Sequence, residues 1–234
     1  MTLMAVFAHP DDEAYGPGAT LARYAADGHR VVLVTLTRGE AGRLGPCADL
    51  PAAEVARLRT RELQCAAAAL GISELSHHAL PDRGLADLSD AEGVALIRRE
   101  ITRYRPGIVI AFEPQGLSRH PDHVTVARWC RRAVENLPDP VRLLYYGISR
   151  AMAERAAAVR EVTFLTDDAI THALPTERWA EAKHAAIRCH ESQLDLWRQF
   201  AALPGEPHHF LDTEYFQEAW PSRRVAAPLD DLLR

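Results

Sequence analysis

The segment Ala8-His9-Pro10-Asp11-Asp12-Glu13 gathers one imidazole and three carboxylates within five residues. It follows a short apolar run, residues 3–8, that predicts a buried strand of about six residues. Charged side chains at the mouth of a buried strand are costly to desolvate unless a metal ion or a substrate compensates them. Pro10 fixes its own φ and biases His9 toward an extended backbone, which holds the side chains in a set arrangement. The segment is therefore predicted to be a site for a metal ion or a substrate rather than a solvated acidic turn.

A second segment of similar composition, His120-Pro121-Asp122-His123, lies more than a hundred residues further along the chain. It follows another apolar run, residues 108–112, of the kind found in parallel sheets. In a doubly wound sheet with the strand order 3-2-1-4-5, ligands bind where the order reverses, between strands one and four. Because the two segments follow those two strands, this topology is expected to bring them into one crevice.

The residue types of the two segments indicate how a metal would be held. His9, Asp12 and His123 provide two imidazoles and one carboxylate, and leave coordination positions open for water and substrate, as in catalytic zinc sites. Asp11 then remains beside the metal as a general base. His120 remains as a cationic group that stabilises an oxyanion or protonates a leaving amine. These are the parts required to hydrolyse an amide.

Other site classes can be built from the same ligands. Two histidines and one carboxylate also bind non-haem Fe(II) in oxygenases, although the spare Asp11 favours hydrolysis. A two-metal phosphoesterase would need Glu13, Glu113 and Asp122 to turn inward as well. A non-catalytic protein that binds a metal or a sugar is a further alternative.

Apolar runs and amphipathic patterns alternate along the first part of the chain. Strands are predicted at residues 3–8, 31–36, 74–79, 108–112, 141–146 and 161–165, with a last extended segment at 208–216. Helices are predicted near residues 16–28, 52–70, 91–104, 124–138 and 175–200. The alternation predicts an α/β fold with a Rossmann-like, doubly wound, mostly parallel sheet flanked by helices. Residues 1–234 are expected to form a single domain, in which 175–234 is a C-terminal extension that covers the site.

Composition narrows the function classes. The net charge of -5 leaves no basic footprint, so nucleic acid is not expected as a partner. The apolar run at the N-terminus is broken by His9 and Pro10, which argues against a signal peptide or a membrane span. The four cysteines are scattered without a CxxC pair and are interpreted as reduced thiols of a cytoplasmic protein; they are Cys47, Cys65, Cys130 and Cys189. Cys47 is a further candidate for contact with the metal or the substrate. A homo-oligomer is one alternative for the assembly of the chain.

Taken together, the two His-Pro-Asp segments resemble the PIG-L/LmbE superfamily of zinc-dependent N-deacetylases. Members remove acetyl groups from N-acetylglucosaminyl compounds, and relatives hydrolyse amides of thiol conjugates or act in antibiotic pathways. The resemblance extends to about Gln193 through weaker pieces, namely Thr37–Glu40, Arg59–Glu62, Pro81-Asp82 and His190–Gln193. His190 and Gln193 are expected to pack near the site or to line its rim.

The resemblance implies a zinc-dependent hydrolase that removes an N-acetyl group from an N-acetylglucosaminyl-type glycoconjugate. The alternative substrates are the amides of a thiol conjugate or an antibiotic intermediate. The resemblance implies that Zn²⁺ is held by His9, Asp12 and His123, where Fe²⁺ is also an option. It implies Asp11 as the general base and His120 as the oxyanion-stabilising or acid group.

The resemblance implies further residues around this set. Arg59 and Asp82 are expected to hold a sugar-like substrate, with a structural salt bridge as the alternative for Arg59. Glu13 and Asp122 are expected to support the ligands from behind. Some members place a tyrosine two residues before the first histidine of the second segment, where this chain has Ser118, so that tyrosine's assistance to the oxyanion is not expected here.

Overall fold

The computed structural model describes residues 1–42, 45, 48–135, 137–203, 212–221, 225 and 227–234. Its strands form one sheet in the order β3-β2-β1-β4-β5-β7-β6, which confirms the predicted order of the first five. The first five strands pair in parallel, and β7 runs antiparallel to both β5 and β6. The strands are β1 (Thr2–Phe7), β2 (Arg30–Thr37), β3 (Glu74–Leu80), β4 (Ile108–Phe112), β5 (Arg142–Gly147), β6 (His172–Pro175) and β7 (Thr213–Trp220).

The central strands are buried on both faces of the sheet. In β1, Leu3, Ala5 and Phe7 join one hydrophobic core, whereas Met4 and Val6 join the other. Because successive side chains point to opposite faces, a strand covered on both sides must be apolar at nearly every position. This explains the continuous apolar runs in the sequence.

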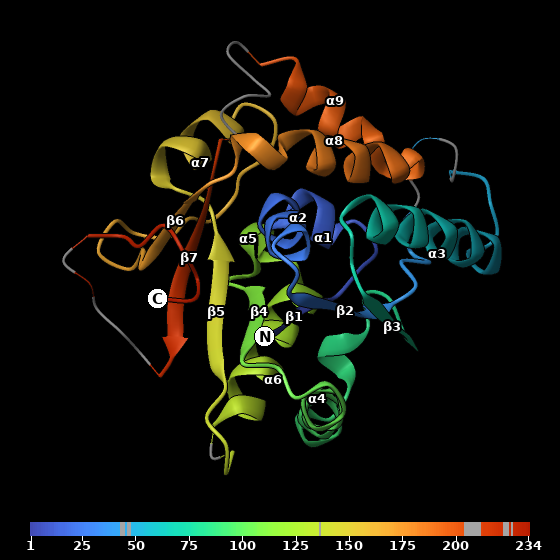
Figure 1. The fold of residues 1–234 in the computed structure, drawn as a ribbon. Helices are drawn as coiled ribbons and strands as arrows, with labels where there is room; N and C mark the ends of the chain where they lie inside the picture. The colour runs from blue at the N-terminus through green and yellow to red at the C-terminus, as the bar shows by residue number, and fades with distance from the viewer. Residues whose placement is uncertain (43–44, 46–47, 136, 204–211, 222–224, 226) are drawn as a thin grey trace.

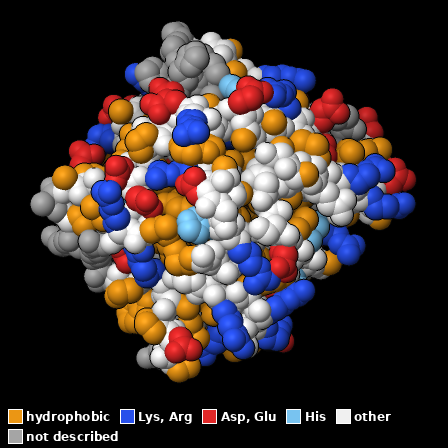
Figure 2. Space-filling view, in the orientation of Figure 1, with side chains coloured by type: hydrophobic (Ala, Val, Ile, Leu, Met, Phe, Trp, Pro, Cys, Tyr) orange, Lys and Arg blue, Asp and Glu red, His pale blue; other side chains and the backbone are white. Residues whose placement is uncertain are grey.

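Helices cover both faces of the sheet and complete three layers (Figure 1). The first core is closed by α2, α3, α7 and α8, and the second by α4 and α6. The helices are α1 (Asp12–Tyr15), α2 (Gly18–Ala26), α3 (Ala52–Ala69), α4 (Asp90–Tyr104), α5 (Gly116–Arg119), α6 (Pro121–Val134), α7 (Arg150–Ala156), α8 (Ala180–Cys189) and α9 (Leu194–Ala201), with short 3-10 turns η2 (Leu85–Asp87), η3 (Glu177–Trp179) and η4 (Glu191–Gln193). On the face of the molecule that Figure 2 shows, basic and acidic side chains are interspersed, so neither sign of charge dominates that face.

The predicted strand at residues 161–165 is wrong. The amide of Thr163 donates to the carbonyl of Leu117, and the amide of Leu165 donates to that of Ile148, so this segment bonds to the loops that follow β4 and β5. These loops offer isolated acceptors rather than a ladder, and no strand forms. The last strand begins at Thr213, and residues 208–211 of the predicted segment lie outside the described residues.

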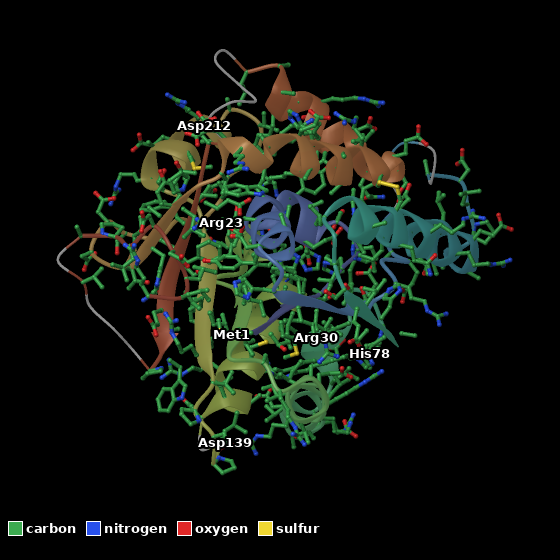
Figure 3. All side chains as sticks on the ribbon, in the orientation of Figure 1. Met1, Arg23, Arg30, His78, Asp139 and Asp212 are labelled. Carbon is green, nitrogen blue, oxygen red and sulfur yellow. A yellow bond between two sulfur atoms is a disulfide. The ribbon has the colours of Figure 1, made fainter. Side chains whose placement is uncertain are left out.

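The interpretation of the cysteines as reduced thiols is wrong for two of the four. Cys65 and Cys189 form a disulfide that joins α3 to the end of α8, visible as the yellow bond in Figure 3. Cys130 is a buried free thiol, and Cys47 lies outside the described residues. Because Cys65 and Cys189 are paired, the cysteines no longer support a cytoplasmic location. That location stays a prediction. None of the helices within the described ranges is long and apolar enough to cross a membrane.

A buried ion pair ties the C-terminal part of the chain to the first βα unit. Nζ of Lys183 on α8 lies 2.6 Å from Oε1 of Glu214 on β7 and donates to the carbonyl of Gly16 at 2.7 Å. Glu214 also accepts the amides of Ala19 and Thr20 at the start of α2. Both charges are therefore hydrogen-bonded, as burial of a charge requires.

Replacing Lys183 by Met should lower the free energy of unfolding by about 3–5 kcal/mol, because it leaves the carboxylate of Glu214 buried without its counter-charge. Urea unfolding followed by circular dichroism measures the change. The matched control is Arg188→Met, which breaks the exposed pair with Glu181 and should cost less than about 1 kcal/mol. Equal costs for the two variants would contradict the role given to Lys183.

Candidate active site

The three predicted metal ligands meet at the carboxyl ends of β1 and β4, which pair with each other in parallel. His9 and Asp12 follow β1, and His123 lies in the first turn of α6. Nδ1 of His9 is 3.1 Å from Nε2 of His123 and 3.6 Å from Oδ2 of Asp12. Oδ1 of Asp12 is 3.2 Å from Nε2 of His123. Asp12 thus contacts the two imidazoles through its two different oxygens. Among the described residues, His9, His120 and His123 also lie close enough together for one nitrogen of each to contact the same ion.

Two of these three separations are those that ligands on one ion require, and the third, between His9 and Asp12, is slightly longer. With metal–ligand bonds of about 2.1 Å, neighbouring donor atoms are separated by roughly 3.0–3.4 Å in octahedral or tetrahedral geometry. Burial alone would raise the pKa of Asp12, but His123 and His9 bring it well below its ordinary value, so the carboxylate is ionised. Two imidazoles and one carboxylate at these separations fit a divalent metal ion.

The second nitrogen of His9 is held by two carboxylates. Nε2 lies 3.1 Å from Oδ1 of Asp82 and 3.1 Å from Oδ2 of Asp122. Asp122 is fully buried and accepts the amides of Arg83 and Leu85. Metal-ligating histidines almost always donate their other N–H to such a partner, which fixes the tautomer and the ring orientation. Both acidic residues therefore lie where they can orient His9.

Asp11 lies beside this cluster and is paired with Arg59 of α3. Nη2 of Arg59 donates to Oδ2 of Asp11 at 2.8 Å and also to the carbonyl of Pro10, while Nη1 donates to the carbonyl of Gly39 at 3.0 Å. Burial raises the pKa of Asp11 to about 6, although Arg59 acts in the opposite direction. Only glycine fits at position 39, where φ is 66° and a side chain would collide with the guanidinium.

The contacts of Arg59 agree with the salt-bridge alternative. The residue is 4% exposed, and its guanidinium donates to the Asp11 carboxylate and to two backbone carbonyls. Arg59→Ala should therefore lower kcat at least about tenfold, because Asp11 loses the group that orients it. KM should change less than kcat. Steady-state kinetics with Arg57→Ala, an exposed arginine on the same helix, as the control tests this. A rise in KM at constant kcat would instead favour direct substrate contact.

His120 is the N-cap residue of α6, and its Nδ1 accepts the amide of Asp122 at 3.2 Å. A nitrogen that accepts an N–H carries no proton, so the ring proton resides on Nε2. Burial, and then the neighbouring His9 and His123, lower the pKa of His120 to about 4. This differs from the cationic group expected from the sequence: with its pKa lowered and Nδ1 accepting an amide, His120 is suited to act as a neutral N–H donor to an oxyanion.

Backbone strain is concentrated in the loops that carry these side chains. Among the described residues, the non-glycine positions with positive φ are Asp11 (110°), Arg83 (63°), Arg105 (48°), Leu117 (58°) and Arg119 (56°). All except Arg105 lie in the segments directly after β1, β3 and β4, with Leu117 and Arg119 in the single turn α5. Such conformations cost about 1–3 kcal/mol each and persist only where surrounding contacts impose them. The strain marks this end of the sheet as a functional site.

Two buried contacts at the site were not predicted from the sequence. Glu13 pairs with His190, and Glu62 accepts two hydrogen bonds from Ser192. The only sequence signal was the polar segment His190–Gln193, which the sequence places inside the predicted helix 175–200 and which follows α8 in the structure.

Comparison with known proteins agrees with this site. A family model described as PIG-L: GlcNAc-PI de-N-acetylase matches residues 4–134, a span that includes both His-Pro-Asp segments. The chain is 31% identical over 271 residues to the 1D-myo-inositol 2-acetamido-2-deoxy-alpha-D-glucopyranoside deacetylase of Streptomyces avermitilis. That match covers 92% of this chain and 90% of the relative.

Solved structures with the same fold belong to proteins with different reactions. One is the N,N'-diacetylchitobiose deacetylase from Pyrococcus horikoshii, with a TM-score of 0.71 at 21% identity, over 92% of this chain and 82% of that one. The conserved protein TT1542 from Thermus thermophilus is similar with a TM-score of 0.70 and 26% identity, over 96% of this chain and 97% of that one. GalB, the 4-carboxy-2-hydroxymuconate hydratase of Pseudomonas putida, has a TM-score of 0.72 at 18% identity, over 97% and 99%. The fold alone therefore does not specify the chemistry. The family model and the relative decide the family: this chain belongs to the PIG-L family of GlcNAc-PI de-N-acetylases.

Proposed function

We propose that this protein is a metal-dependent amide hydrolase that removes the N-acetyl group from an N-acetylglucosaminyl-type glycoconjugate. The observation that carries the proposal is the clustering of His9, Asp12 and His123, whose polar atoms contact one another at 3.1–3.6 Å. The carboxylate of Asp11, which is held by Arg59, interacts electrostatically with His9 and Asp12. The substrate class is supported by the curated relative, whose name gives an acetamido sugar linked to inositol. Zn²⁺ is the proposed ion, and Fe²⁺ is the alternative in the same ligand set.

The proposed roles follow from the positions of the side chains. His9, Asp12 and His123 hold the ion, which when bound polarises the acetamide carbonyl and lowers the pKa of water. Asp11 accepts a proton from the attacking water as the new C–O bond forms. Nε2–H of His120 donates to the carbonyl oxygen as it gains negative charge.

Collapse of the tetrahedral species breaks the C–N bond. The proton held by Asp11 passes to the departing nitrogen, so that one water and one acetamide give one acetic acid and one amine, which exchange a proton in solution to become acetate and ammonium. No oxidant, reductant or second substrate is needed.

The test is the release of amine and acetate from a panel of amides by zinc-loaded protein. The panel contains N-acetylglucosamine, its α-glycoside with inositol and an N-acetylated thiol conjugate. Equal amounts of amine and acetate from the glycoside are expected. Turnover of the thiol conjugate alone would favour the alternative amidase. Consumption of dioxygen without acetate would overturn hydrolysis in favour of an Fe(II) oxygenase.

A further inference from the structure

The backbone of Asp11 adopts a conformation that needs external support. Its φ of 110° and ψ of -27° are unfavourable for a residue with a side chain. Two hydrogen bonds hold its carbonyl, from the amides of Ala14 and Tyr15. Its own amide donates to Oε2 of Glu13 at 3.1 Å. The direction of the Asp11 carboxylate therefore depends on where the side chain of Glu13 lies.

The side chain of Glu13 is in turn held by His190. Both residues are fully buried, and Nε2 of His190 lies 2.5 Å from Oε1 of Glu13. Within the described part of the chain, Nδ1 of His190 has no hydrogen-bond partner. The imidazole thus has one polar contact, and that contact is to the residue that receives the amide of Asp11.

The turn that carries His190 is anchored to α3. In η4, the amide and the hydroxyl of Ser192 donate to the two carboxylate oxygens of Glu62 at 2.8 and 2.7 Å. The residue before His190, Cys189, is joined to α3 through its disulfide with Cys65. Glu62 lies one helical turn from Arg59, which contacts the Asp11 side chain. Helix α3 therefore supports Asp11 in two ways. Arg59 contacts the Asp11 side chain directly, and Glu62 and Cys65 hold the turn that carries His190.

We propose that His190 is a positioning residue for Asp11. It holds Glu13 where the carboxylate accepts the amide of Asp11, and this contact fixes the strained backbone that aims the Asp11 carboxylate at the attacking water. The proposal rests on the proposed function of Asp11 as the general base. The ordinary alternative is a buried pair that only stabilises the fold, and the two readings differ in what the loss of His190 does to catalysis.

Two substitutions of His190 separate these readings. His190→Leu removes the N–H donor, whereas His190→Gln keeps a donor at the position of Nε2. His190→Leu should lower kcat about 10- to 100-fold, with KM and bound metal unchanged, because a small misplacement of the base is enough for such a loss. His190→Gln should recover most of the lost rate. Equal rates for the Leu and Gln variants would overturn the proposal.

A double-mutant cycle with Asp11 tests the route of the effect. If His190 acts through Asp11, adding His190→Leu to Asp11→Asn should change the residual kcat by less than about twofold, since residues that act as a unit are not additive. A purely structural role predicts the same loss in both backgrounds, and that result would reject positioning. Full activity of Asp11→Asn alone is a separate outcome, which would overturn the proposed base itself.

The control for burial is His172→Leu. His172 is also fully buried, and its Nδ1 lies 2.8 Å from the hydroxyl of Thr171, away from Asp11. Its loss should lower stability but leave kcat within about twofold. If His190→Leu does not fold, His190→Asn replaces it, because its amide is too short to reach Glu13. A kcat of the Asn variant equal to that of His190→Gln would then count against the proposal.

Discussion

Replacing Asp11 by Asn should lower kcat about 100-fold or more while the protein keeps its metal. The amide of asparagine preserves the size of the side chain and can still contact Arg59, but it cannot accept a proton from water. Asp11 is not among the three side chains whose donor atoms meet, so its loss should not remove the ion. Steady-state kinetics and metal analysis of the same preparation measure both quantities.

The control for this substitution is Asp27→Asn, which neutralises an exposed carboxylate at the end of α2. It should leave kcat unchanged. Retention of full activity by Asp11→Asn would show that another group takes the proton. Loss of the metal together with the activity would instead show that Asp11 is needed to hold the ion.

Replacing His123 by Ala should remove the metal and with it nearly all activity. Nδ1 of His123 lies 3.1 Å from the carbonyl of Gly116, which places its proton there and directs the lone pair of Nε2 toward Asp12 and His9. Affinity for zinc should fall by more than the roughly 10- to 100-fold that follows loss of an outer hydrogen-bond partner. A competition assay with a chromophoric chelator measures the change.

The matched control is His120→Ala, which removes a neighbouring imidazole whose Nδ1 is occupied by the α6 amide of Asp122. It should lower kcat but leave the affinity for zinc within about tenfold, since it takes away an oxyanion donor rather than a ligand. If the two alanine variants lost metal equally, His120 would have to be counted as a fourth metal ligand. Unchanged affinity in His123→Ala would reject that residue as a ligand.

The parts of the fold that the sequence predicts well are those governed by local patterns. The run Ile108–Phe112 is apolar at every position because both faces of β4 are covered, and the structure has this strand with the predicted bounds. The meeting of His9 with His123 follows from a topological rule that places the ends of strands one and four together. Neither inference needs the details of packing.

The features that escaped prediction depend on contacts between distant parts of the chain. Residues 161–165 have strand-like composition, but they pair with none of the seven strands of the sheet and bond to Leu117 and Ile148 instead. Cys65 and Cys189 are separated by 124 residues, and only the packing of α8 on α3 brings them together. No local pattern encodes either arrangement.

The acidic and basic residues around the metal ligands show the same limit. The family resemblance implies Arg59 and Asp82 as polar residues near the site, but it does not distinguish a substrate contact from an internal one. In the structure, Arg59 bonds to Asp11 and two carbonyls, while Asp82 bonds to His9. That these two residues contact a substrate stays a prediction, and the kinetics of Arg59→Ala test it for Arg59.

The central claim is that the two His-Pro-Asp segments form one metal site that hydrolyses an acetamide. The most direct test is to strip the protein of metal, return zinc in measured equivalents and follow amine release from the acetamido-glucosyl inositol substrate. We expect no activity without metal and a linear rise that levels off at about one zinc per chain, because His9, Asp12 and His123 form one cluster of ligands. Full activity of the metal-free protein, or a rise that continues to two equivalents, would contradict it.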